Sequence, residues 1–445
     1  MTEDMNDLRI SAEADKRPAG DRELLIFGEG DGALSKDTGV KYTKPKLGYL
    51  AIALLGGIVL GAAVTILAVS SITGGLSNLR LIKNMGKYDS SVISELMQKI
   101  DAYHFGDTPS SDKLVEEASH ALVDAVDDPY ASYFTEKEYT DYSSSFNGRY
   151  CGIGVLVQKP DSTGSVIVRV YEDSFAEQAG VKAGDVIIKV DDKEVKDISS
   201  NELVDLITGE AGTTVDLTVL RDDRKLTITV TRGEVYVKRV DSMMLEDNVG
   251  YIYLSQFSGD AVKEFETALN ELTEQGAKSL IIDLRNDPGG ALNIAVKLCD
   301  MMLPECVICS MQGKTTEETE YFRSDKEMYD IPFVVLVNEN SASASEIFAG
   351  AMQDNGRAKI IGVQTFGKGV VQTTFRLDNG HGYLKLTTDA YYTPNGTNLG
   401  GTGITPDIAA ELPEELKMLD VYTLYTQHLE EDTQIQAALK ELKNN

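Results

Sequence analysis

Three short phrases of the sequence carry side chains that could perform chemistry, and the first contains three serines. The phrase ENSASASEIFAG (339–350) follows an apolar strand pattern and begins a helix pattern. A serine at a helix N-terminus gains from the helix dipole, and free N–H groups there can bind an oxyanion. By composition, Ser341, Ser343 and Ser345 are equal candidates for a nucleophile. The alternative is that they only cap the helix.

The second phrase, TFGKGVVQ (365–372), places a single lysine among glycines and apolar residues. Burial at such a position would lower the pKa of Lys368, and a neutral lysine can deprotonate a serine. Gln372 follows four residues later, so it could hold the lysine by a hydrogen bond. The alternative is an ordinary surface lysine in a loop.

The third phrase, DLRNDPGGAL (283–292), lies between a strand pattern and a helix pattern. Gly289 and Gly290 have no side chains, so their N–H groups could approach a reacting carbonyl as an oxyanion hole requires. The alternative is a plain turn between a strand and a helix.

The elements that must position these phrases alternate between strand and helix from residue 248 onwards. Strands are predicted at 250–254, 279–284, 333–337 and 358–362, and helices at 260–275, 291–302 and 345–354. This alternation predicts an α/β core with a parallel sheet. Several of the phrases follow strand ends, where open α/β sheets usually bind ligands.

Residues from about 150 to 231 form a different pattern of short strands with two helices. The helix after Ser199 begins with a capping box, Ser-x-x-Glu, that includes Glu202. This region resembles a PDZ domain in the phrases YCGIGV (150–155) and DSFAEQAGVKAGDVIIKVD (173–191). The resemblance implies that a loop containing Tyr150, Gly152, Ile153 and Gly154 binds the terminal carboxylate of a peptide, which adds as a strand. The alternative is a small β domain without a ligand.

Together the phrases resemble the carboxyl-terminal processing peptidases, over residues 88–408. The resemblance also includes DDPYASYF (127–134), GYIYLSQFS (250–258) and GTGITPD (401–407). It implies that Ser343 is the nucleophile, Lys368 the general base and Gln372 its support, with oxyanion donors from Ala344 and from Gly289 or Gly290. It further implies a core similar to the crotonase and ClpP folds, and a PDZ domain that binds substrate carboxyl termini and gates the active site. The resemblance implies no metal and no organic cofactor. It does imply that the protein forms a homodimer.

A membrane anchor is predicted near the beginning of the chain. Residues 47–69 contain no charge, and 23 helical residues would span about 34 Å. The alternatives are a cleaved signal peptide and a buried core helix. Lysines lie closer before this span than after it, which favours a cytoplasmic N-terminus and a protease on the other side of the cell membrane.

The complete prediction is an α/β protease core with an inserted PDZ domain, an N-terminal helical region and one transmembrane helix. Its parts are a cytoplasmic tail (1–46), a signal anchor (47–70), a helical region (71–145), the PDZ domain (146–235), the protease core (236–410) and a C-terminal helical segment (411–445), with one helix expected from about 413 to 442. The partners would be the lipid bilayer and protein or peptide substrates with an accessible carboxyl terminus.

Charge and composition exclude some functions. A net charge of −29 disfavours nucleic-acid binding, which requires basic patches. The four histidines are scattered singly, so a metal site is not expected. Cys306 and Cys309 have the spacing of zinc sites, redox dithiols or a local disulfide, but buried free thiols are favoured for the four cysteines, which also include Cys151 and Cys299.

Two other functions remain open at this point. A Ser-His-Asp hydrolase would use His381 as its base, although no motif accompanies that histidine. A non-catalytic, anchored PDZ adaptor would leave Ser343, Lys368 and Gln372 without a role.

Overall fold

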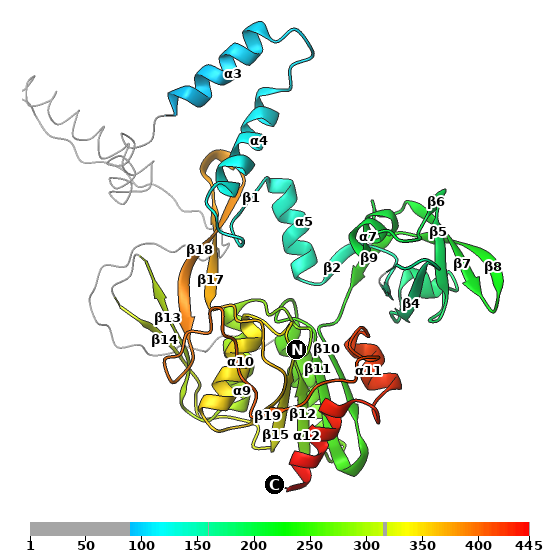
Figure 1. Ribbon diagram of the computed structural model, residues 1–445, viewed down its shortest axis with the longest axis vertical. Coiled ribbons are helices and arrows are strands. Elements are labelled where there is room, and N and C mark those ends of the chain that lie inside the picture. Colours follow the sequence, from blue (N-terminus) through cyan, green and yellow to red (C-terminus); the bar gives the residue numbers. More distant parts are fainter. Residues whose placement is uncertain (1–89, 159, 315–317, 445) are drawn as a thin grey trace, which may run out of the picture. The chain divides into compact units, whose positions relative to one another are not determined.

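The computed structural model describes residues 90–158, 160–314 and 318–444 (Figure 1). The chain divides into two compact units, residues 1–111 and 112–445. In the first unit the described residues form helix α3 (Ser91–Tyr103), none of which is buried. The predicted anchor at 47–70 lies outside the described residues. Within those residues, no helix has both the length and the apolar character needed to span a bilayer.

The second unit begins with two helices on either side of a short strand. These are α4 (Ser111–Asp124), β1 (Ser132–Phe134) and α5 (Glu136–Phe146). Helix α5 begins at a capping box, in which the Thr135 hydroxyl accepts from the Glu138 N–H and the Glu138 carboxylate accepts from the Thr135 N–H. The predicted break of the helical pattern at DDPYASYF is confirmed, because β1 and the turn before it occupy this phrase.

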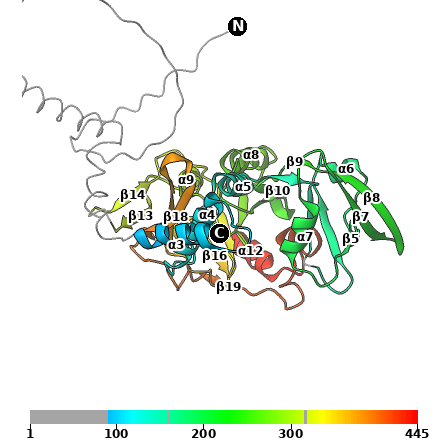
Figure 2. The ribbon, with the colours of Figure 1, turned by 90° about the horizontal axis from the view of Figure 1, so that it is seen from above.

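The region with PDZ-like phrases forms its own sheet and core. Its elements are β3 (Val155–Val157), β4 (Ser165–Val170), α6 (Phe175–Gln178), β5 (Val186–Val190), β6 (Lys193–Glu194), α7 (Ser200–Ile207), β7 (Thr214–Arg221) and β8 (Arg224–Thr231). The strand order is β3-β4-β5-β7-β8, with β6 paired to β5, and α6 and α7 lie beside these strands (Figure 2). The predicted capping box of Ser199 and Glu202 is present. Strands β2 (Arg149–Gly152) and β9 (Gly233–Tyr236) pair with each other where the chain enters and leaves this region.

The α/β core is built on a six-stranded sheet with the order β10-β11-β12-β15-β16-β19. Its strands are β10 (Val240–Met244), β11 (Val249–Leu254), β12 (Ser279–Asp283), β15 (Phe333–Val337), β16 (Lys359–Gly362) and β19 (Ile408–Ala409). The pairs from β11 to β19 are parallel, as predicted, and β10 is antiparallel to β11. Strand β15 is buried at all five positions because helices cover both faces of the sheet.

The covering helices divide between the two faces. Helices α8 (Ala261–Glu274), α9 (Leu292–Met302) and α10 (Ala344–Asp354) pack on one face with Ile252, Ile282 and Val335, among others. Helices α11 (Val421–Gln427) and α12 (Thr433–Asn444) pack on the other face, as Figure 1 shows.

A second sheet joins the amino-terminal segment, defined here as residues 127–146, to the core. Strands β13 (Val307–Gly313), β14 (Glu320–Arg323), β17 (Val370–Arg376) and β18 (Tyr383–Tyr392) belong to it. Strand β18 pairs with β1, β13 and β17. The DDPYASYF phrase is therefore joined, through β1 and β18, to the strand that contains Gln372.

The single helix expected from about 413 to 442 is wrong, because two separate helices occupy this segment. The Asp420 carboxylate caps α11 by accepting from the Thr423 N–H. Asp432 ends the connection between the helices, accepts from the Ile435 N–H and bonds to Arg285 at 2.7 Å. Because the Asp432 carboxylate caps α12 and also bonds to the buried Arg285, Asp432 lies at a helix start and not in the middle of a continuous helix.

Arg285 lies at the centre of a buried polar network between the sheet and these helices. Its guanidinium donates to Asp283, Asp432 and Gln434, and the Tyr251 hydroxyl also donates to Asp283. The side chains of Arg285, Asp283 and Asp432 are at most 1% exposed. Such a network is costly to disrupt, because removing one partner leaves a buried charge uncompensated.

We predict that Asp432→Ala lowers the free energy of unfolding by about 3 kcal/mol, because Arg285 loses one of its two carboxylate partners. Urea denaturation followed by tyrosine fluorescence measures this change. The matched control is Lys443→Ala on α12, which removes the exposed pair of Lys443 with Asp247 and should leave the midpoint unchanged. Equal losses in the two variants would show that the buried network has no special weight.

Candidate active site

The structure separates the three serines that the sequence leaves equal. The Ser341 hydroxyl is buried, donates to the Leu284 carbonyl at 2.7 Å and accepts from the Asn338 N–H. The Ser345 hydroxyl is also buried and donates to the Asp287 carbonyl at 3.0 Å. Ser343 is half-buried and immediately precedes α10. Of the three, Ser343 is therefore the one placed to meet a substrate.

The backbone at Ser343 is strained. Its φ of 56° and ψ of −112° are unusual for a residue with a side chain, and such a conformation costs about 1–3 kcal/mol. The DPGG turn packs directly against it. A Cβ added to Gly289 would lie 2.4 Å from the Ala342 carbonyl oxygen and 2.8 Å from the Ser343 Cβ, so only glycine fits there. The turn thus holds the serine at the start of α10.

Lys368 lies in the loop before β17, and its amine is half-buried. The Nζ donates to the Gln372 Oε1 at 2.8 Å, which confirms the contact expected between these two side chains. The Gln372 amide in turn donates to the Thr387 hydroxyl at 3.3 Å. Burial lowers the pKa of Lys368 from its ordinary value of 10.5, and the positive charge of Lys385 lowers it further, whereas Asp128 and Glu346 act in the opposite direction.

A buried carboxylate, Glu346, connects the serine to the lysine. Its Oε2 accepts from the backbone N–H groups of Ser343 and Lys368, each at 2.9 Å. Its Oε1 accepts from the Thr365 hydroxyl at 2.6 Å and from the Gly367 N–H at 2.8 Å. Each oxygen therefore accepts two bonds, and bonds to a charged group are the strong ones in proteins, about 1.5–3 kcal/mol each. Glu346 fixes the two main-chain segments relative to each other.

The expected oxyanion donors lie at the same turn, but their N–H groups differ. The Gly289 N–H donates to the Asp287 carboxylate at 2.7 Å and is therefore occupied. Burial raises the pKa of Asp287 well above its ordinary value. Ala344 is the first residue of α10, where N–H groups have no partner within the helix. An added Cβ on Gly289 would lie 2.7 Å from the Ala344 nitrogen, so this N–H and the glycine turn are neighbours.

The serine and lysine side chains are not yet joined. Among the described residues, no hydrogen bond links the Ser343 hydroxyl to the Lys368 amine, whose partner is Gln372. The arrangement has the parts for attack of a serine on a carbonyl: a serine at a helix N-terminus, a partly desolvated amine held nearby, and N–H groups at the same turn.

The four residues expected to bind a peptide carboxylate lie together in the PDZ-like region. A groove of about 1070 Å³ is lined by Tyr150 and Ile153, by Val155 and Val157 of β3, and by Val204 of α7, among others. Within the described residues, the N–H groups of Ile153 and Gly154 donate to no backbone carbonyl, whereas their carbonyls accept from Ala176 and Tyr171. Gly152 and Gly154 do not line the groove, whose walls combine apolar side chains with charged ones such as Arg149 and Arg239.

His381 lies away from the site of Ser343 and Lys368. It is exposed in the turn between β17 and β18, and its carbonyl accepts from the Tyr133 hydroxyl. Strand β17 separates Gln372 from this turn by at least four residues, or about 13 Å at 3.3 Å per residue. The hydrolase that would use His381 as its base therefore loses its support.

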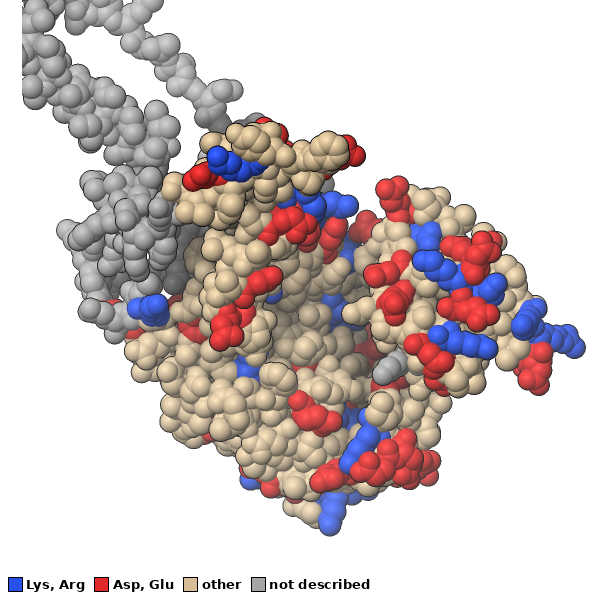
Figure 3. Space-filling view, turned by 45° about the horizontal axis from the view of Figure 1, so that its top comes forward, with Lys and Arg blue, Asp and Glu red and all other residues tan. Residues whose placement is uncertain are grey.

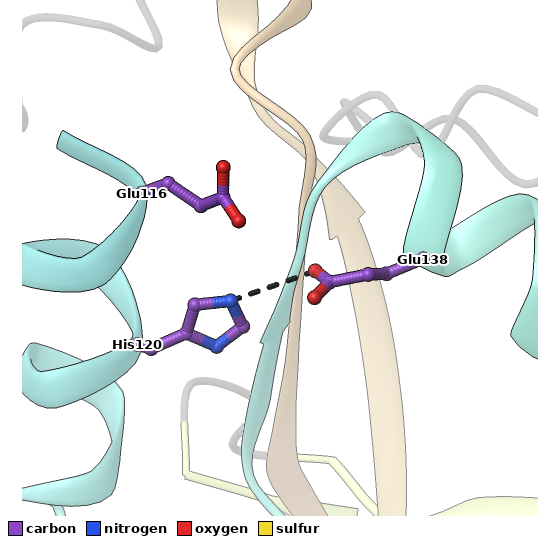
Figure 4. A group of neighbouring side chains, drawn as sticks. All are labelled: Glu116, His120 and Glu138. Carbon is purple, nitrogen blue, oxygen red and sulfur yellow. Dashed lines mark ion pairs between the residues drawn. The ribbon is translucent and has the colours of Figure 1, made fainter. Parts of the chain in front are cut away.

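One group of described side chains has the spacing of metal ligands. Glu116, His120 and Glu138 bring their ligand atoms within 4.8 Å of one another (Figure 4). Ion pairs within the protein account for them: His120 pairs with Glu138 at 3.5 Å, and Glu116 pairs with Lys113 at 3.4 Å. The cluster connects α4 to the capping box of α5, and we assign it no metal.

The four cysteines form no disulfide. Cys299 and Cys309 are buried, as favoured from the sequence, and Cys151 and Cys306 are half-buried.

On the face shown in Figure 3, basic side chains are interspersed with acidic ones.

Comparisons with known proteins agree with this fold. A family model described as peptidase family S41 matches residues 248–410, and a PDZ domain model matches 166–221. A protein of Staphylococcus haemolyticus described as a CtpA-like serine protease is 34% identical over 382 residues, which cover 84% of this chain and 75% of the relative. A carboxy-terminal-processing protease of Bartonella bacilliformis is 35% identical and covers 83% and 85% of the two chains.

One solved structure supports the fold alone. A Bacteroides fragilis protein described as an S41 protease has a TM-score of 0.51 and 16% identity, and the match covers 76% of this chain and 92% of that one. Fold and site define a serine-type peptidase with a PDZ domain. The chain belongs to peptidase family S41, among the carboxy-terminal-processing proteases.

Sequence reasoning missed Glu346. The signal was present, because a glutamate three residues after a serine at a helix start is a capping-box pattern. That pattern explains the Glu346 bond to the Ser343 N–H. It could not show that the same carboxylate also binds the loop of Lys368, since that contact depends on the tertiary fold.

We predict that Glu346→Gln lowers kcat/KM by at least about a hundredfold, while the protein remains folded. A glutamine has one acceptor oxygen in place of two, and its NH₂ group would face N–H donors, so the loop of Lys368 loses its position. Steady-state peptidase kinetics measure the loss. Glu339→Gln, an exposed residue just before the same turn, serves as the control. Full activity of Glu346→Gln would show that this carboxylate does not position the site.

Proposed function

We propose that this chain is an endopeptidase with a Ser–Lys dyad, which cleaves extracytoplasmic proteins near their carboxyl termini. The observation that carries the proposal is the common attachment of Ser343 and Lys368 to Glu346, with the lysine amine partly desolvated and held by Gln372. A dyad needs both groups in one place and an amine that can lose its proton near neutral pH.

The reaction would follow from these positions. The neutral Lys368 amine accepts the proton of the Ser343 hydroxyl as the serine oxygen attacks the scissile carbonyl. The N–H groups of Ala344 and Gly290 stabilise the oxyanion, because the Gly289 N–H is bonded to Asp287. The lysine then donates its proton to the leaving amine. In the second half, the lysine activates a water molecule that hydrolyses the acyl-enzyme and frees the serine.

The PDZ domain would select substrates by their ends. A free terminal carboxylate would accept from the N–H groups near Ile153 and Gly154, and an apolar last side chain would fit between β3 and α7. The resemblance to carboxyl-terminal processing peptidases supports a second role for this domain, in which peptide binding gates the active site.

The remaining parts of the proposal concern location and assembly. The uncharged span at 47–70 would anchor the protein in the cell membrane, with its N-terminus in the cytoplasm and the protease outside. A homodimer and a core of the crotonase and ClpP type are proposed on the family resemblance.

The dyad predicts a specific dependence of activity on pH. Because the neutral amine is the active form, kcat/KM should rise with pH along a limb whose midpoint lies below 10.5, the ordinary lysine pKa. Lys368→Arg should be inactive at every pH, since its guanidinium cannot accept a proton. Initial rates on a peptide with an apolar carboxyl end, measured as a function of pH, test both statements.

Two serine variants serve as the matched pair for the dyad. Ser343→Ala should abolish cleavage. Ser341→Ala removes a buried hydrogen bond, so it should lower the free energy of unfolding more than it lowers kcat. Wild-type activity in either Ser343→Ala or Lys368→Arg would refute the dyad.

For the PDZ groove, we predict that a peptide with a free carboxyl terminus binds at least about tenfold more tightly than the same peptide amidated at that end. The amide lacks the charge that strengthens bonds from backbone N–H groups. Val204→Glu should weaken binding of the free peptide, because Val204 lines the groove and is 46% exposed. Leu226→Glu, on β8 outside the groove, is the control. Fluorescence anisotropy measures both affinities, and equal affinity for acid and amide would contradict carboxylate recognition.

A further inference from the structure

The DDPYASYF phrase has no role in the mechanism described so far, yet it contacts the proposed base. The ring of Tyr130 lies over the Lys368 amine, with 4.3 Å between the Nζ and the ring centroid. Tyr130 and Lys368 are both half-buried. The amine is thus held between an aromatic face and the Gln372 oxygen, which accepts from it at 2.8 Å.

The segment that carries Tyr130 is fixed at several points. The Asp128 carboxylate accepts from the Tyr130 N–H at 2.9 Å and from the Thr387 N–H of β18 at 3.2 Å. Strand β1 continues the attachment by pairing with β18 from Ser132 to Phe134. The pair of His120 with Glu138 connects the helices on the two sides of the segment (Figure 4). The segment that carries the Tyr130 ring is therefore attached to β18 by hydrogen bonds.

The same sheet carries the other groups around the amine. In the β17–β18 register, Gln372 is opposite Thr387 and Thr374 is opposite Lys385. Residues two apart on a strand share a face, so Lys385 and Thr387 lie on one face of β18. Two rings of the amino-terminal segment, Phe134 at 5.6 Å and Tyr142 at 5.0 Å, cover the Lys385 amine.

We propose that Tyr130 is a positioning residue that shields the Lys368 amine from water and holds it beside Gln372. The inference rests on the proposed dyad and extends it to a residue more than 200 positions earlier in the chain. The amino-terminal segment would then be part of the catalytic unit, because it supplies one wall of the pocket around the base.

The Tyr130 ring has two opposing effects on the pKa of Lys368, so the direction in which that pKa moves when the ring is removed tests the proposal. An aromatic face favours the charged amine, whereas exclusion of water favours the neutral amine. Burial is the largest cause of the lowered pKa of Lys368, ahead of the charges that face it, which are Lys385 from β18, Asp128 before β1 and Glu346 from α10. If shielding is the main effect of the ring, its removal raises the pKa of Lys368.

The test compares Tyr130→Ala with Tyr130→Phe in the full-length protein. In Tyr130→Ala, we expect the rising limb of the pH–kcat profile to move up by about one pH unit, which lowers kcat about tenfold below that limb. KM should change little, since the contact is with the enzyme's own base. Tyr130→Phe keeps the ring and should keep the wild-type profile. Tyr130→Asn, which also admits water, replaces the alanine variant if that variant does not fold.

Two controls separate this inference from the proposed function. Tyr321→Ala removes an exposed ring that covers Arg323 at 5.8 Å, and it should leave the profile unchanged. Activity in Lys368→Ala would refute the dyad itself. If Lys368→Ala is inactive and the limb of Tyr130→Ala stays in place or moves down, the dyad stands and the shielding role of Tyr130 is wrong.

Discussion

The active site depends on one buried carboxylate. Ser343 follows a strand of the core sheet, and Lys368 precedes a strand of the second sheet, so nothing in local structure brings them together. Glu346 does so by accepting two bonds on each oxygen, from the backbone of both segments and from the Thr365 hydroxyl. A carboxylate buried with all its acceptor positions filled tolerates little displacement, because each lost bond leaves charge unsatisfied. The strained backbone of Ser343 and the loop of Lys368 share this restraint, and the Phe366 N–H supports it by donating to the Ser341 carbonyl at 3.1 Å.

This restraint also limits how the site can change state. Both main-chain amides are bonded to Glu346, whereas the lysine amine is bonded to Gln372 and not to the serine. In the proposed dyad, the lysine side chain would therefore rotate, about a backbone that Glu346 holds, to reach the serine.

The sequence predicted the core well where periodicity and length decide the structure. The short apolar run at 333–337 is rich in valine, which favours a buried strand, and the observed β15 has those bounds. Local capping chemistry was equally readable at Ser199. The C-terminal segment was misread as one helix because the role of Asp432 depends on Arg285, which lies 147 residues away in sequence. The same limit applies to the site: motif resemblance selected Ser343, but composition could not distinguish it from Ser341, whose hydroxyl is occupied by Leu284.

The paired strands β2 and β9 give the PDZ domain an unusual attachment. The chain enters the domain through Arg149–Gly152 and leaves it through Gly233–Tyr236, and these two strands are hydrogen-bonded neighbours. A domain inserted in this way has two tethers that begin at nearly the same place. A large displacement of the domain would require breaking the hydrogen bonds between these two strands. Under the proposed function, a peptide end bound to this domain would stay within reach of the core, at a local concentration that the length of these two strands sets and the solution concentration does not.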